Sequence, residues 1–177
     1  MEQSPLRFPH LAAKTMVCHT ITYFLMGVLA SHFLHYAELF NNPNSGMRPI
    51  TSSWVMAGPL FQPLRGLLFA SVFWPLRHCL FGRPHCWFIL GWMLVAIGII
   101  GTFAAPGGSL EGVIYTPIPI VDHLKGWLEV VPQALLLSAL LCYWVAHPGR
   151  KWLNWLLGVI FFVLMTLPVL GLLTTRH

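Results

Sequence analysis

The chain has 177 residues, of which 56% are hydrophobic and 8% are charged, and its mean hydropathy is +0.70. Soluble domains carry roughly 25% charged residues, so this composition excludes an ordinary soluble fold and predicts an integral membrane protein. The net charge of +5 is spread along the chain without a basic run, which excludes a nucleic-acid-binding surface.

In hydrocarbon, every backbone polar group must find its partner within its own segment, so membrane spans are helices of about 20 apolar residues. Stretches poor in charged residues predict an all-α transmembrane bundle of five such helices, forming a single integral membrane domain over residues 1–177. The predicted spans are residues 15–38, 54–77, 86–105, 124–147 and 151–173. A tight hairpin, "HPGRK" (147–151), joins the last two spans, and one long outer loop joins the third and fourth.

Lys and Arg are enriched in short cytoplasmic loops, and their distribution here predicts a cytoplasmic N-terminus and an outer C-terminus. The inner side then carries Arg7, Lys14, Arg77, Arg83, Arg150 and Lys151. The outer side carries the acids Glu38, Glu111, Asp122 and Glu129 and the basic residues Arg48, Lys125 and Arg176. The predicted location is therefore the cytoplasmic (inner) membrane, crossed several times, with an organelle membrane as the alternative.

The first apolar stretch has an alternative interpretation as a cleaved signal peptide. Arg7 and Lys14 precede it, and "VLA" (28–30) has the small residues that a signal peptidase accepts, so cleavage would leave four helices. The length of the stretch and the lack of a polar segment after it favour an intact first span.

Three polar residues share one flank at the outer end of the first span. His32, His35 and Glu38 recur every third residue in "SHFLHYAE", and two imidazoles with a carboxylate can ligate a metal or relay protons. Metal-binding pairs on helices also use a spacing of four, so the favoured interpretation is interfacial histidines bonded to loop groups.

A b-type haem would need axial histidines on facing helices at matching depth. His19 and His32 lie on the same helix, and no other predicted span has a histidine at mid-depth. No cofactor is therefore predicted, with haem and a metal as minor alternatives.

Arg65 is the charged residue in the interior of the second span. It follows Trp54, an interface anchor, by eleven residues, which places it about 16 Å deep and near the middle of the hydrocarbon core. A charge there costs at least about 2.5 kcal/mol unless it is paired. We expect a buried ion pair with Glu129 of the fourth span, extended by Gln62 and Gln133 into a polar patch. This patch is either a site for an anionic headgroup, a quinone or another small ligand, or a structural pair that fixes helix register.

Three sets of residues favour a structural role over chemistry. The inner loop "RHCLFGRPHC" contains four soft ligands, His78, Cys79, His85 and Cys86, but its spacing lacks a zinc knuckle and favours a basic turn facing anionic lipid. Small residues that allow close approach of helices are Gly27, Ser31, Gly91, Gly98 and Gly101. No CxxC pair occurs, and the cysteines in apolar segments are interpreted as inert packing residues.

The outer loop, residues 105–122, is too long for a simple turn and too apolar for disorder. We expect it to fold back on the outer end of the bundle as a lid. Its polar residues and the start of the next helix, namely Glu111, Tyr115, Asp122 and His123, would then lie over the same side as His32, His35 and Glu38.

Three classes of function fit these observations. The leading prediction is a non-enzymatic accessory or scaffold component of the membrane, because no GxSxG, HExxH or P-loop motif is present. The alternative is a protein that binds or transports a lipid or small molecule at Arg65 and Glu129, and the second is a membrane enzyme using the outer His and Glu residues. The expected partners are membrane lipids, other membrane subunits or a second copy of the chain.

Overall fold

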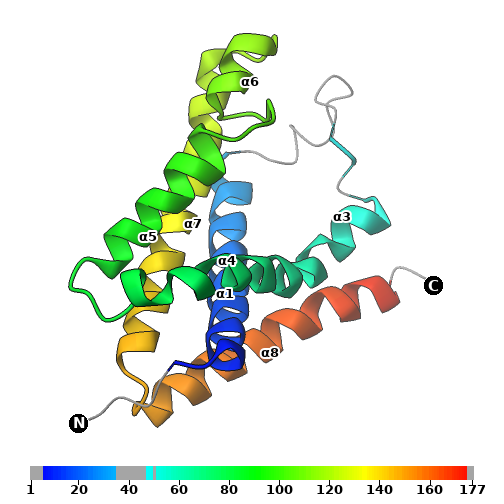
Figure 1. Cartoon of the computed structure of the whole chain (residues 1–177). Helices are drawn as coiled ribbons and strands as arrows, with labels where there is room; N and C mark the ends of the chain where they lie inside the picture. Colours follow the sequence, from blue (N-terminus) through cyan, green and yellow to red (C-terminus); the bar gives the residue numbers. More distant parts are fainter. Residues whose placement is uncertain (1–5, 35–46, 50, 175–177) are drawn as a thin grey trace.

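The computed structural model describes residues 6–34, 47–49 and 51–174 (Figure 1). The prediction of an all-α fold is confirmed, since the described residues form helices, turns and bends without a strand. The elements are α1 (Phe8–Phe33), α3 (Ser53–Ala57), the 3-10 turn η2 (Gly58–Phe61), α4 (Gln62–Leu80), α5 (Cys86–Val95), the π turn η3 (Ala96–Ile100), α6 (Leu110–Tyr115), α7 (Ile120–Ala146) and α8 (Lys151–Thr174).

Four helical segments are long and apolar enough to cross a membrane, which supports a membrane protein. They are Phe8–Phe33, Ser53–Leu80, Ile120–Ala146 and Lys151–Thr174. The first begins well before the predicted residue 15, because Pro9 suits the first turn of a helix and Lys14 finds a partner inside the bundle. Residues 35–38 of the predicted first span lie outside the described residues.

The third predicted span, residues 86–105, is shorter in the structure. The apolar helix there runs Cys86–Ile100, about 22 Å, against a hydrocarbon core of about 30 Å. Its last turn is a π turn, closed by the Gly101 amide donating to the Ala96 carbonyl at 2.8 Å. Gly98 and Gly101 weaken the helix here and Pro106 follows, so the helix ends five residues earlier than the hydropathy predicted.

Helix α1 lies at the centre of the arrangement. It packs against α4, α7 and α8, whereas α5 packs along α7 (Figure 1). The C-terminal half of α8 lies beside α3 and η2, away from α5. Helix α1 is therefore the shared neighbour of α4, α7 and α8. A side chain of α1 that points toward α4 or α7 lies at a helix interface.

One end of the bundle collects the basic residues. A single core cluster, which includes Leu11, Leu80, Cys86, Leu141 and Leu153, joins the start of α1, the end of α4, the start of α5, the end of α7 and the start of α8. We call this the basic end, and it carries Arg7, Lys14, Arg77, Arg83, Arg150 and Lys151. The charge grouping derived from the sequence is thus present in the fold, and the direction in which this end faces stays a prediction.

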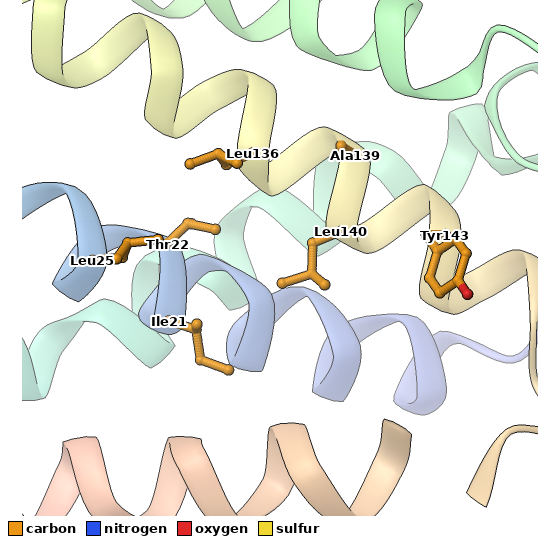
Figure 2. A pocket seen from close by; sticks show the side chains of 7 residues that line it. All are labelled: Ile21, Thr22, Leu25, Leu136, Ala139, Leu140 and Tyr143. Atoms are coloured by element: carbon orange, nitrogen blue, oxygen red, sulfur yellow. The ribbon is translucent and has the colours of Figure 1, made fainter. Parts of the chain in front are cut away.

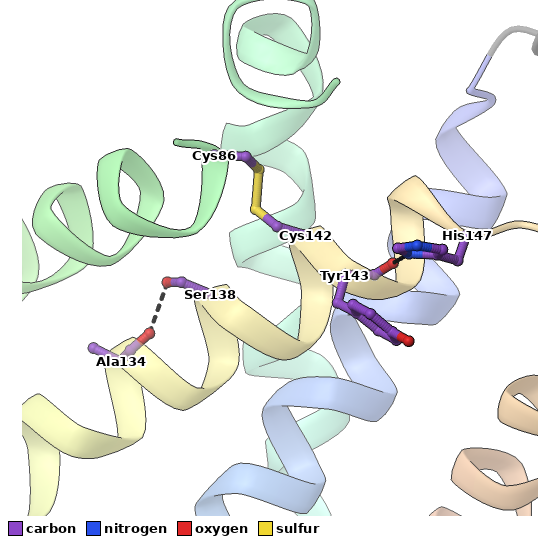
Figure 3. The surroundings of a disulfide bond; sticks show 6 residues. All are labelled: Cys86, Ala134, Ser138, Cys142, Tyr143 and His147. Carbon is purple, nitrogen blue, oxygen red and sulfur yellow. Dashed lines mark hydrogen bonds between the residues drawn. A yellow bond between two sulfur atoms is a disulfide. The ribbon is translucent and has the colours of Figure 1, made fainter. Parts of the chain in front are cut away.

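A disulfide joins Cys86 at the start of α5 to Cys142 near the end of α7, with their Cα atoms 6.1 Å apart (Figure 3). The interpretation of these two cysteines as inert packing residues is therefore wrong. The bond also removes Cys86 from the minor zinc alternative in the 77–86 loop. Cys18 is buried and Cys79 is exposed, both as free thiols.

Candidate functional site

Arg65 is exposed on α4, so the prediction that it is buried is wrong. The reason is that the neighbouring Gly66 faces α1, and successive residues of a helix point about 100° apart. The Arg65 guanidinium lies over the Phe69 ring, 5.6 Å from its centroid. The salt bridge seen on α7 is local, between Lys125 and Asp122 at 2.9 Å, and the pairing of Arg65 with Glu129 stays a prediction.

The face of α4 that packs on α1 carries Gln62, Gly66, Ala70 and Phe73, which recur at helical spacing. A Cβ on Gly66 would lie 2.6 Å from the Met16 Cα, so the two helix backbones are in direct contact at this crossing. Small residues are the usual means by which membrane helices approach so closely. Gly66 therefore fixes how closely α4 approaches α1, and so brings the neighbouring side chains of α4 into contact with α1.

Gln62 and His19 form the polar contact of this crossing. The His19 Nε2 and the Gln62 Oε1 are 3.1 Å apart, and both side chains are buried. The Gln62 side-chain amide also donates to the Gly58 carbonyl at 3.3 Å. The backbone amide of Gln62 bonds instead to the Pro59 carbonyl, as in a 3-10 turn. The sequence placed Gln62 in a patch with Arg65 and Glu129; the bond that the structure gives its side-chain oxygen is to His19.

His19 retains one unused ring atom. The Gln62 Oε1 can only accept, so Nε2 donates to it, and in the neutral ring Nδ1 would be a lone-pair acceptor. Among the described residues, Nδ1 has no hydrogen-bond partner, although the side chain is only 1% exposed. The edge of the Phe69 ring packs against the imidazole, with centroids 5.0 Å apart.

Tyr23 connects this contact to α7. It lies one turn beyond His19 on α1 and within electrostatic range of both the Arg65 guanidinium and the Glu129 carboxylate. Three helices therefore direct polar side chains to one region, which we call the mid-bundle cluster: His19, Tyr23, Gln62, Arg65 and Glu129. Gln133 is partly buried one turn further along α7.

The mid-bundle cluster lies near the middle of α1. His19 follows the first residue of that helix by eleven positions, about 16 Å, and precedes the last by fourteen, about 21 Å. Polar side chains at this depth of a membrane bundle are costly unless they bond to one another. From the sequence, His19 was interpreted only as a candidate haem ligand; the available signal was its position about five turns before the predicted outer end at residue 38.

The outer histidine flank is described only in part. His32 is exposed near the end of α1, with its ring against Phe33. His35 and Glu38 lie outside the described residues, so their predicted role remains untested. In the described ranges, no group of three or more His, Cys, Asp or Glu residues is placed to hold a metal ion.

The outer loop folds back on α7, and the contact is made by one glycine. The Gly108 amide donates to the His123 Nδ1 at 2.7 Å, and the Gly108 carbonyl accepts from the Trp127 Nε1 at 2.7 Å. His123 and Trp127 are one turn apart on α7, so together they bond both the backbone amide and the carbonyl of Gly108. Of the polar residues predicted there, only His123 is buried; Glu111, Tyr115 and Asp122 are exposed.

Replacing Gly108 by alanine is expected to release this loop from α7. Gly108 has a φ of +90°, which costs an L-residue about 1–2 kcal/mol, and a Cβ there would lie 3.0 Å from the Trp127 Nε1. The measurement is hydrogen exchange of the amides of residues 108–116, which we expect to accelerate at least tenfold. Gly107→Ala is the control, because nothing lies within 4 Å of its Cβ position. Equal exchange in both variants would contradict this contact.

Comparisons of the chain with protein-family models, curated proteins and solved structures found no match. The function is therefore argued from the geometry described above.

Proposed function

We propose that this chain is a non-enzymatic accessory component of a membrane assembly, whose outward helix faces contact other membrane proteins. The observation that carries the proposal is the position of α8. This helix of 24 residues buries only Leu153 and Leu157 in the bundle, so most of its apolar surface faces outward. Large side chains gather there, with Trp155 71% and Phe162 69% exposed.

Several polar groups inside the spans support the same proposal, because they are bonded within the bundle. Thr15, Thr22 and Ser138 donate to carbonyls of their own helices, and the Lys14 ammonium donates to the Trp144 carbonyl at 2.8 Å. The first three bonds satisfy polar atoms within their own helices, and the Lys14 bond joins α1 to α7, as expected of a packed scaffold.

The test is photo-crosslinking from α8 in native membranes. A photoreactive residue in place of Trp155 or Phe162 is expected to yield an adduct with the same membrane protein from both positions. The matched control is a photoreactive residue in place of Trp144, which is 6% exposed and faces the bundle interior. Adducts with lipid alone from both outward positions would overturn the proposal.

The mid-bundle cluster favours a second candidate, the binding of a small amphiphile. The Nδ1 of the buried His19 has no partner among the described residues and could accept a hydrogen bond from a ligand, and Arg65 supplies a positive charge in the same region. Native mass spectrometry of protein released from lipid nanodiscs would reveal a stoichiometric ligand. We expect Arg65→Leu to lose that ligand and Arg83→Leu, at the basic end, to keep it.

Variants of Arg65 and Glu129 separate a ligand site from a structural pair. A ligand site predicts that the Arg65→Leu, Glu129→Leu double variant folds like the wild type and loses the bound mass. A structural pair predicts that each single variant unfolds while the double variant survives, because removing one partner strands the other charge.

A further inference from the structure

A groove lies on the surface of the bundle between α1 and α7 (Figure 2). Its volume is about 430 Å³, and it is lined by Ile21, Thr22 and Leu25 of α1 and by Leu136, Leu140 and Tyr143 of α7. The Thr22 hydroxyl donates to the Cys18 and His19 carbonyls, at 2.9 and 3.1 Å, and so presents no free donor to the groove. The walls are therefore apolar up to the Tyr143 hydroxyl.

The Tyr143 end of the groove belongs to the basic end. The Arg150 guanidinium donates to the Tyr143 hydroxyl and lies 5.3 Å from the centroid of that ring. The His147 ring lies beside Tyr143, with centroids 4.3 Å apart (Figure 3). Lys14 lies close by on α1, bonded to the Trp144 carbonyl. The groove thus ends where positive side chains gather.

Negative side chains lie far from this end in the described part of the chain. The acid nearest to Tyr143 along α7 is Glu129, fourteen residues or about 21 Å away. A bound anion at Tyr143 and Arg150 would therefore meet attraction from Arg150, Lys14 and Lys151, with no carboxylate of the described part of α7 beside it. Juxtamembrane basic groups of this kind each contribute about 1 kcal/mol toward anionic lipid.

We infer that this groove binds one anionic phospholipid, with an acyl chain against the α1–α7 wall and the phosphate at Arg150. The size of the groove favours a chain over a helix. Leu136 and Tyr143 are seven residues apart, about 10 Å along α7, and a helix 10 Å across would fill roughly 800 Å³ over that length. The groove offers about half of that volume.

The experiment uses delipidated full-length protein in detergent, titrated with phosphatidylglycerol or phosphatidylcholine and followed by native mass spectrometry. The wild type is expected to hold one phosphatidylglycerol at least tenfold more tightly than phosphatidylcholine. Arg150→Gln is expected to lose about fivefold for phosphatidylglycerol and little for phosphatidylcholine. Arg83→Gln is the control, because this basic-end residue lies in the 81–85 loop and not at the groove.

Two variants test the acyl-chain wall independently of charge. Ala139 lines the groove and is exposed, so Ala139→Phe fills it without disturbing the core, and both lipids are expected to bind at least tenfold more weakly. Leu25→Trp, on the opposite wall and 50% exposed, is expected to act the same way and guards against a folding defect in the first variant. Equal affinity for the two lipids, equal losses in Arg83→Gln and Arg150→Gln, or full binding by both filled variants would overturn the inference. A dimer that the filled variants dissociate would also overturn it, by assigning the groove to a second copy.

Discussion

Gly66→Leu is expected to destroy the folded bundle, because it places a side chain where α4 touches the backbone of α1. A Cβ at this position would lie 2.6 Å from the Met16 Cα and 3.2 Å from the Thr15 carbonyl oxygen. Neither contact can be relieved by rotating a side chain, so α4 must move away. The loss is expected to be about 3 kcal/mol or more, a large share of the stability of a typical domain. The measurement is the fraction of monodisperse protein after detergent extraction, together with its unfolding temperature.

Gly27→Leu is the matched control for this prediction. Gly27 is also a helical glycine in a span, but nothing lies within 4 Å of its Cβ position. We expect its stability to stay within about 0.5 kcal/mol of the wild type. Similar behaviour of the two variants would show that the α1–α4 crossing is not the close contact described.

Breaking the His19–Gln62 bond is expected to have the second largest effect. His19→Leu leaves the Gln62 amide oxygen buried without a donor, and Gln62→Leu leaves the imidazole N–H without an acceptor. An unpaired buried polar group costs about 1–3 kcal/mol, so each single variant should lose that much in the free energy of unfolding. The double variant should lose less than the sum, with a coupling of about 1 kcal/mol.

Thr20→Val provides the reference for this cycle. Thr20 is buried one residue after His19, but its hydroxyl donates to the Met16 carbonyl of its own helix, at 2.8 Å. It should therefore show no coupling to Gln62→Leu beyond about 0.3–0.5 kcal/mol. Additive losses for His19 and Gln62 would mean that their contact contributes nothing to the packing of α1 on α4.

The sequence allowed good prediction of the apolar helices and poorer prediction of the faces on which they pack. Hydropathy depends on composition along one segment, so three of the four long helices lie within a few residues of their predicted bounds, and the first begins seven residues earlier than predicted. The register of packing depends on which residue the neighbour touches. Among the predicted small packing residues, Gly91 does pack against α7, next to Leu135 and Ser138, whereas Gly27 and Gly98 face open space. Gly66, where the backbones of α4 and α1 come into contact, was not among the predicted packing residues.

In the candidate site, too, features of a single segment were more predictable than contacts between helices. The sequence predicted a polar patch around Arg65 that includes Gln62, and the structure bonds the Gln62 side chain to His19. The identity of the partner was not predictable, since His19 is 43 positions away and only the α1–α4 crossing brings it near. The pairing of Cys86 with Cys142, separated by 56 positions, also arises from helix packing and has no local spacing signal. Gly108 was one of several loop glycines, and its contacts with His123 and Trp127 require the fold.

The disulfide at the basic end connects the redox state of a compartment to the way the bundle is inserted. Positive residues favour the reducing cytoplasmic side, whereas disulfides persist on the oxidising side of a membrane. The basic residues at this end favour the cytoplasmic side, whereas the bond between Cys86 and Cys142 at the same end favours the oxidising side. Blocked thiols at these two positions in intact cells mean that the basic end faces an oxidising space, against its charge. Free thiols mean that it faces the cytoplasm, and that α5 and α7 are held together there by packing alone.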